Sequence, residues 1–292
     1  MSIKIITDST SDISQKEAKE LNITVLPLHV IFADGEYTDG IDLMPEEFYE
    51  KLVKSQNLPS TSQLTPEQYL PYFEDAKSNH DTLIVLTVSS KLSGTYQSAV
   101  IAKDMVEYDN IYIIDSLNVT LGLQILIRKT VDLLNLGYDV TKMVTEIEKA
   151  KHNIKLFAVL ESLEYLKKGG RLSGVGAFAG TILNIKPIIE IKDGEVSVAG
   201  KARGMSSGYQ KLLQLIEQSG GINYNSHYCI GYSAYRDNTD DFLKISNKNL
   251  ELNSRYISPI GTVVGTHAGP GVCGIAFFSN ENNWLMYQIM LP

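Results

Sequence analysis

Several features of membrane, disulfide-linked and nucleic-acid-binding proteins are scarce in this sequence. The 292 residues include only two cysteines, and no run approaches the ~18 consecutive apolar residues of a membrane span. Cys229 and Cys273 lie in the apolar stretches "HYCIGY" and "GVCGIAFF" without metal-ligand spacing, so we expect both to be reduced core residues. With 26 basic and 34 acidic residues, the net charge of -8 argues against bulk binding to nucleic acid or anionic membrane.

The rest of the composition is typical of a globular protein. Hydrophobic residues make up 43% of the chain and charged residues 21%. The first residues, "MSIKIITDSTSD", lack the apolar region of a signal peptide, so we expect a cytoplasmic protein. The length suggests two domains or one large α/β domain.

Strand-like and helix-like patterns alternate through the first half of the chain. Residues 81–90 and 110–116 are apolar and strand-like, and each is followed by a helical pattern. This alternation predicts a mostly parallel sheet with helices on both faces, in an α/β fold. The pattern changes near residue 155, which predicts domains 1–155 and 156–292. Near the end, residues 255–278 are expected to form a strand, a glycine-rich loop and another strand.

Three of the predicted strands end with similar polar residues, in "IITDS", "LTVSS" and "IIDS". The carboxyl ends of parallel strands share one rim of a sheet, where open α/β sheets bind ligands. Serine and aspartate also cap helices, so one such ending alone indicates little. Together the three endings favour a ligand site at this rim.

The stretch "VLTVSSKLSGTYQSAVIA", residues 85–102, places Ser93, Gly94 and Thr95 where a loop enters a helix. The unpaired N–H groups of a helix start, with hydroxyls beside them, suit a carboxylate or phosphate. A helix cap without a ligand is an equally good interpretation. A serine-dependent lipid esterase using Ser93 and His267 is a third, although the G-x-S-x-G elbow is absent and no acid lies close to His267.

Other motifs give weaker signals. No G-x-x-x-x-G-K-[ST] motif occurs, and "GGRLSGVGAFAG" does not connect a strand to a helix as a nucleotide-binding loop would. Two basic groups, "KKGGR" with Arg171 and "GKARG" with Arg203, could dock an acidic partner or be a solvated face.

An ordered series of motifs resembles one known family along nearly the whole chain. The motifs are "IITDSTSD", "PSTSQLTPEQY", "SSKLSGTYQSA", "IIDS", "LESLEYLKKGGRLSG", "ILNIKPII", "KARG" and "HAGPG". They resemble the DegV family, the fatty-acid-binding subunit of bacterial fatty acid kinase. The resemblance implies an EDD-type Rossmann-like domain plus a second α/β domain, with one long-chain fatty acid between them. It further implies a lipid-binding protein of phospholipid metabolism that is not itself an enzyme.

The family's binding residues can be carried onto this sequence. The resemblance implies that Thr61, Ser93, His267 and the Gly94 N–H hold the fatty acid carboxylate. A separate kinase subunit, which carries ATP, would phosphorylate this carboxylate to an acyl phosphate, and Arg171 and Arg203 would face that partner. The neighbours of the clamp that we consider as additional ligand contacts are Ser62, Thr95 and Thr266. We expect transient membrane contact at most, and no nucleic acid, metal or other cofactor.

A fatty acid also needs a dry tunnel. The apolar segment "GVGAFAGTILNIKPII" has glycines for space and branched side chains for lining, although ordinary core segments look the same. The tunnel residues we expect from it are Phe178, Ala179, Ile182, Leu183 and Ile185.

Overall fold

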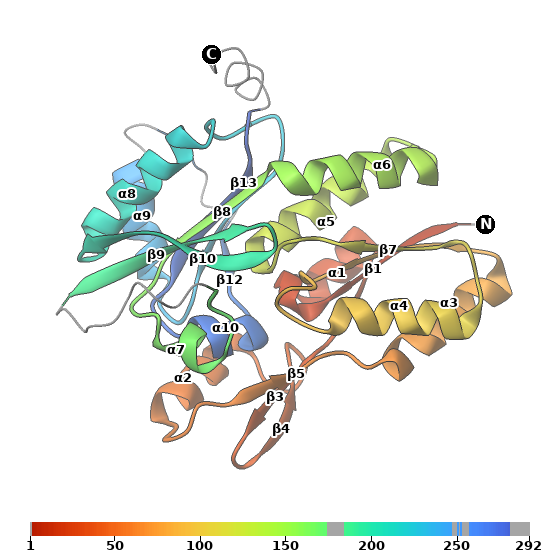
Figure 1. The fold of residues 1–292 in the computed structure, drawn as a ribbon, viewed down its shortest axis with the longest axis horizontal. Helices are drawn as coiled ribbons and strands as arrows, with labels where there is room; N and C mark the ends of the chain where they lie inside the picture. Colours follow the sequence, from red (N-terminus) through yellow and green to blue (C-terminus); the bar gives the residue numbers. More distant parts are fainter. Residues whose placement is uncertain (1, 174–183, 247–249, 251, 253–256, 281–292) are drawn as a thin grey trace.

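The computed structural model describes residues 2–173, 184–246, 250, 252 and 257–280. Two large sheets lie side by side, and a small sheet lies below them (Figure 1). Among the described residues, no helix is long and apolar enough to cross a membrane.

The first large sheet is parallel throughout, as predicted. Its strands, in the order β2-β1-β6-β7, are β2 (Thr24–Leu26), β1 (Ile3–Asp8), β6 (Thr82–Thr87) and β7 (Ile111–Asp115). The chain adds the short 3-10 helix η1 (Ser9–Ser11) and the helices α1 (Gln15–Leu21), α3 (Pro66–Asn79), α4 (Thr95–Val106), α5 (Thr120–Asn135) and α6 (Val140–Ala150). Side chains alternate along β6, so Ile84 and Leu86 pack with α5 and α6 while Leu83 and Val85 pack with α3 and α4.

The second large sheet is mixed, and it contains the strands of the second half of the chain. Its order is β10-β9-β8-β13-β11-β12, and all of its pairs are antiparallel except β11–β12. The strands are β8 (Ile154–Val159), β9 (Ile185–Lys192), β10 (Glu195–Arg203), β11 (Tyr228–Tyr232), β12 (Ile257–Pro259) and β13 (Cys273–Phe278). The remaining elements are η2 (Lys151–Asn153), α7 (Glu164–Lys168), α8 (Met205–Gln218), α9 (Asp237–Ser246) and α10 (Thr262–Ala268).

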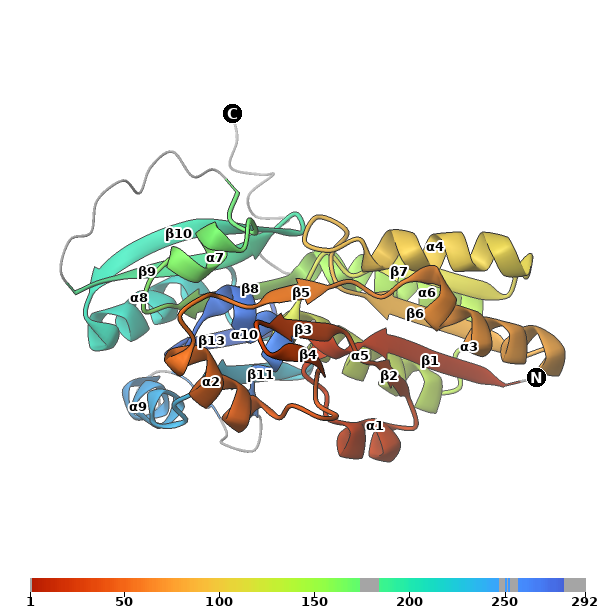
Figure 2. The same ribbon diagram turned by 90° about the horizontal axis from the view of Figure 1, so that it is seen from below.

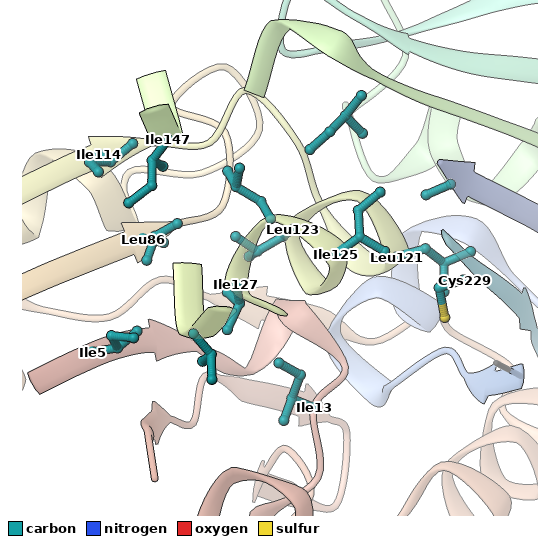
Figure 3. Close-up of a cluster of buried hydrophobic side chains, with 14 of the residues drawn as sticks. Ile5, Ile13, Leu86, Ile114, Leu121, Leu123, Ile125, Ile127, Ile147 and Cys229 are labelled. Atoms are coloured by element: carbon teal, nitrogen blue, oxygen red, sulfur yellow. The ribbon is translucent and has the colours of Figure 1, made fainter. Parts of the chain in front are cut away.

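A continuous apolar core joins the two large sheets (Figure 3). It runs from Ile5 and Leu86 of the first sheet, through Leu123 and Ile125 of α5, to Cys229 of the second sheet. Cys229 and Cys273 are both buried and free, as predicted. The predicted boundary at residue 155 falls on the second residue of β8, and the division into two domains there stays a prediction.

The small antiparallel sheet, with the order β4-β3-β5, belongs to the first half of the chain. It contains β3 (His29–Phe32), β4 (Gly35–Thr38) and β5 (Ser60–Ser62), and α2 (Pro45–Lys54) follows β4. Seen from below, β5 runs beside β3 close to α10 (Figure 2). This sheet therefore brings a segment near residue 61 next to a helix near residue 265.

Helix α10 corrects one prediction, because we expected a glycine-rich loop where the structure has a helix. Its start is held by two carboxylates of the first half. Asp12 accepts a hydrogen bond from the Gly261 N–H at 3.0 Å, and Asp39 accepts from the Thr262 N–H at 3.0 Å and its hydroxyl at 2.7 Å. These bonds satisfy N–H groups that the helix itself leaves unpaired.

Both carboxylates are buried, and burial raises the pKa of Asp39 above its usual value and that of Asp12 well above it. Both carboxyl groups face the positive end of the helix dipole, which favours their charged forms. The second half of the chain is thus bound to the first at the helix that carries His267.

We predict that Asp39→Ala destabilises the fold by about 3 kcal/mol, because it leaves the Thr262 N–H and hydroxyl buried without an acceptor. Asp39→Asn keeps an acceptor oxygen and should lose much less. Urea unfolding measures both, and equal losses for the two variants would contradict this role of Asp39.

The difference in stability between the wild-type protein and Asp39→Asn should depend on pH. Because the folded pKa of Asp39 lies above the unfolded one, the folded state binds more protons, and wild-type stability falls as the pH rises through this range. Asp39→Asn lacks this titration, so its stability relative to wild type should rise as the pH increases above about 4.

Candidate functional site

A cavity of about 180 Å³ lies between the two large sheets. Its floor is one face of the second sheet, formed by alternate residues, as the two-residue period of a strand requires. In β8 and just after it these are Leu156, Ala158 and Leu160; Ile189 and Ile191 follow in β9, Val196 in β10 and Gly274 in β13. The rest of the apolar lining comes largely from the first half of the chain and from α10, including Leu28, Val88, Leu92, Val119, Leu121 and Val263.

These lining residues were missed by sequence reasoning. The strands "IKLFAVL" and "VCGIAFF" are apolar on both faces, so their patterns do not show which face bounds a cavity. Ala158 and Gly274 are directly paired across β8 and β13 in the middle of the floor. Their small size leaves a trough in the sheet.

Polar groups gather at one end of the cavity, which we call the head end. Thr61 comes from β5, Ser93 and Gly94 from the turn before α4, Arg171 from the segment after α7, and His267 from α10. The structure therefore brings together all four residues predicted to hold the carboxylate. Ser62 and Gln63 also line this cavity.

His267 forms a pair with Thr61, whose Oγ1 lies 2.8 Å from the imidazole Nε2. Burial, with a smaller contribution from the nearby Arg171 charge, lowers the pKa of His267 to about 4, so the ring is neutral at pH 7. Its Nδ1 is buried and has no hydrogen-bond partner among the described residues. A proton on Nδ1 would be an unpaired buried donor, whereas a proton on Nε2 can be donated to Thr61. We therefore assign the proton to Nε2.

That assignment determines what the Thr61 hydroxyl can do. Its oxygen accepts from His267, so its own proton remains available to a group in the cavity. His267 thus donates to the Thr61 oxygen and leaves the Thr61 proton to point into the cavity.

Ser93 has an equivalent arrangement. Its Oγ lies 2.9 Å from the Thr95 hydroxyl and accepts from the Thr95 N–H at 3.3 Å. The Thr95 hydroxyl in turn accepts from the Leu64 N–H at 3.4 Å. If Thr95 donates its hydroxyl proton to Ser93, the Ser93 proton can point into the cavity. Thr95 itself is fully buried behind Ser93 and does not line the cavity.

Gly94 adds a backbone donor at the start of α4. Within the described part of the chain nothing accepts from its N–H. The Gln63 side chain packs against its Cα, where a Cβ would come within 2.1 Å of the Gln63 Oε1. Only glycine fits this position without displacing Gln63.

Gly169 allows a similar close approach beside His267. A Cβ on Gly169 would lie 2.3 Å from the His267 Nδ1. The Gly169 carbonyl accepts from the Arg171 guanidinium at 2.6 Å, so the same turn also places the arginine. Arg171, predicted to face a partner, thus lines the head end, while Arg203 is exposed at the end of β10.

The aspartates at the strand ends hold the loops of this rim and do not line the cavity. Asp8 accepts from the Val88 N–H at 2.8 Å, and Asp115 accepts from the Ser90 N–H at 3.1 Å. Neither residue lines the cavity. Both hold the loop that leads to Ser93, so this rim contributes hydroxyls and backbone to the head end instead of carboxylates.

Two more of the predicted site residues do not line the cavity, and four others lie outside the described residues. Ile185 is the first residue of β9, paired with Arg203, and does not line the cavity. Thr266 donates its hydroxyl to the Thr262 carbonyl at 2.9 Å inside α10 and also does not line it. The other predicted tunnel residues lie outside the described residues: Phe178, Ala179, Ile182 and Leu183.

The geometry does not support a serine esterase. His267 pairs with Thr61, and Ser93 pairs with Thr95, so no base among the described residues contacts the Ser93 hydroxyl. No group of three or more metal-ligating side chains occurs in the described ranges. The head end thus gathers hydrogen-bond donors beside an apolar lining.

Comparison with known proteins agrees with this fold. A DegV domain-containing protein of Caldanaerobacter subterraneus subsp. tengcongensis is 35% identical over 275 residues, 94% of this chain and 98% of its own length. A fatty-acid-binding DegV family protein from Thermus thermophilus has a TM-score of 0.86 at 29% identity, covering 96% of this chain and 100% of that one.

A second solved structure, from Eubacterium ventriosum, is described as a fatty acid (stearic acid)-binding protein. It has a TM-score of 0.83 at 28% identity and covers 94% of this chain and 97% of that one. The family model described as "Uncharacterised protein, DegV family" matches residues 2–280. This chain therefore belongs to the DegV family.

Proposed function

We propose that this protein binds a long-chain fatty acid, with the carboxylate at the head end and the acyl chain in the cavity. The observation that carries the proposal is a pair of hydroxyl groups, those of Thr61 and Ser93, whose oxygens are each hydrogen-bonded to a second residue. The Thr61 oxygen accepts a hydrogen bond from His267, and the Ser93 oxygen accepts one from Thr95. Their protons and the Gly94 N–H can then meet an acceptor-only group such as a carboxylate.

Charge at the head end also suits a carboxylate. Arg171 provides a positive charge close enough to lower the His267 pKa, while the imidazole stays neutral. A carboxylate removed from water without such partners would be strongly disfavoured. Hydrogen bonds from neutral groups together with one nearby cation compensate for that loss.

The apolar lining provides the affinity. At ~0.8 kcal/mol per buried CH₂, a chain of about fourteen methylenes gains roughly 11 kcal/mol before the cost of ordering it. The related proteins of Thermus thermophilus and Eubacterium ventriosum, described as binding fatty acids, support the same ligand class here.

The further step in the proposal is presentation of the carboxylate to a separate kinase. No base in the described contacts activates Ser93, so the protein's own role is to hide the tail and orient the carboxylate oxygens for attack on ATP in a partner. Arg203 is exposed at the end of β10, with Lys201 exposed two residues before it on the same strand. This basic pair would meet an acidic surface of the kinase.

Replacing Ser93 tests the head end. Ser93→Ala removes one donor and should weaken binding of octadecanoic acid about tenfold to a hundredfold. Ser90→Ala is the matched control, because Ser90 is exposed in the same loop and only its backbone N–H makes a bond there. Native mass spectrometry and calorimetric titration provide the measurements. A wild-type protein that neither carries nor takes up a fatty acid would refute the proposed function.

Gly169→Ala tests whether His267 supports Thr61. The new methyl group would displace the imidazole, so fatty acid affinity should fall on the order of tenfold while the fold persists. Gly200→Ala is the control, since a Cβ there meets nothing closer than 3.8 Å. Titration and thermal unfolding of both variants check this, and unchanged affinity of Gly169→Ala would argue against this role of His267.

Arg203→Ala tests the partner surface. It should reduce acyl phosphate formation with the kinase at least tenfold and leave fatty acid affinity unchanged, because Arg203 does not line the cavity. Coupled kinase assays and fatty acid titration separate the two effects. Equal losses in both assays would mean that this surface is wrongly assigned.

A further inference from the structure

The cavity extends away from the head end along β8. Leu160 immediately precedes the segment that leads to α7 and then to Gly169. Gly169 lies beside His267 at the head end. Ala158 and Leu156 follow on the same face in steps of two residues, so Leu156 lies roughly 13 Å from Leu160 along the strand. Ile189 is paired opposite Ala158, which places Ile191 at the level of Leu156. These two side chains mark the far end of the floor.

At this end the floor has a gap. Pairing between β8 and β9 stops at Phe157 and Glu190. Beyond it, β8 remains paired with β13 as far as Ile154, and β9 remains paired with β10 as far as Lys192. The two strands therefore separate just beyond Leu156 and Ile191.

A second cavity, of about 450 Å³, lies at this gap. Its lining is mainly polar and charged: Asn118, Lys151, His152, Asn153, Lys155, Glu190, Lys192, Asp193, Gln218, Ser219, Ser279 and Asn280. Among the described residues, only Leu156 and Ile191 line both cavities. The two side chains thus separate an apolar space from a polar one.

We propose that Leu156 and Ile191 are the end wall of the acyl cavity and set the longest chain that this protein binds. The inference rests on the proposed function. Each methylene up to the wall gains burial, about fourfold in affinity. A longer chain must displace the two side chains and then enters a polar cavity, where a methylene gains little. Affinity should therefore rise with chain length and then fall sharply.

The test is competition among saturated fatty acids of increasing length, from tetradecanoic to docosanoic acid, read by native mass spectrometry. Ile191→Ala should move the optimum to longer chains, with at least a fourfold gain for the first acid beyond the wild-type limit. Leu156→Ala should shift it in the same direction. Ile191 is only half-buried, so its variant is the less disruptive of the two.

Ile188→Ala is the matched control. Ile188 lies in the same strand but is fully buried on the opposite face, in the core with Tyr209 and Phe242. It should lower the melting temperature and leave the chain-length profile unchanged. Unchanged profiles in both wall variants, or the same shift in Ile188→Ala, would overturn the end-wall assignment. Absence of any fatty acid on the wild-type protein would instead refute the proposed function.

Discussion

The contact on which the site depends is the pair of buried carboxylates at the start of α10. Asp12 and Asp39 lie in the first half of the chain, and the helix that they hold lies in the second. His267 is carried in the last turn of that helix, where it meets Thr61 of the small sheet. The head end is therefore assembled only when the two halves pack together, and its geometry depends on carboxylates that do not themselves line the cavity.

The contacts at the head end favour binding over covalent chemistry. A serine and a histidine in one pocket suggest nucleophilic catalysis, but each is paired with a threonine instead of with the other. The low pKa of His267 keeps the ring uncharged, so it acts as a hydrogen-bond donor rather than as a cation. Such a site can orient a carboxylate without reacting with it.

Much of this could be predicted from the sequence where local chemistry determines the outcome. The alternating patterns predicted the parallel sheet, and the loop before residue 95 predicted the cluster around Ser93. Helix α10 could not be predicted, because "TVVGTHA" is rich in β-branched residues and glycine, and its stability comes from contacts with Asp12 and Asp39 far away in the chain. Nor could the floor: Leu156 and Ala158 differ from their neighbours only in which face of β8 they occupy.

The head end takes its groups from residues 61, 93, 171 and 267, which span most of the chain. A nascent or partly unfolded chain therefore lacks the assembled head end, and occupancy by the proposed ligand would report that both halves are in place. A ligand that binds only the assembled form stabilises it by mass action, in proportion to the logarithm of its concentration over Kd. With a fatty acid as the proposed ligand, the lipid supply would then affect the fraction of folded protein and, through it, how long the protein survives in the cell.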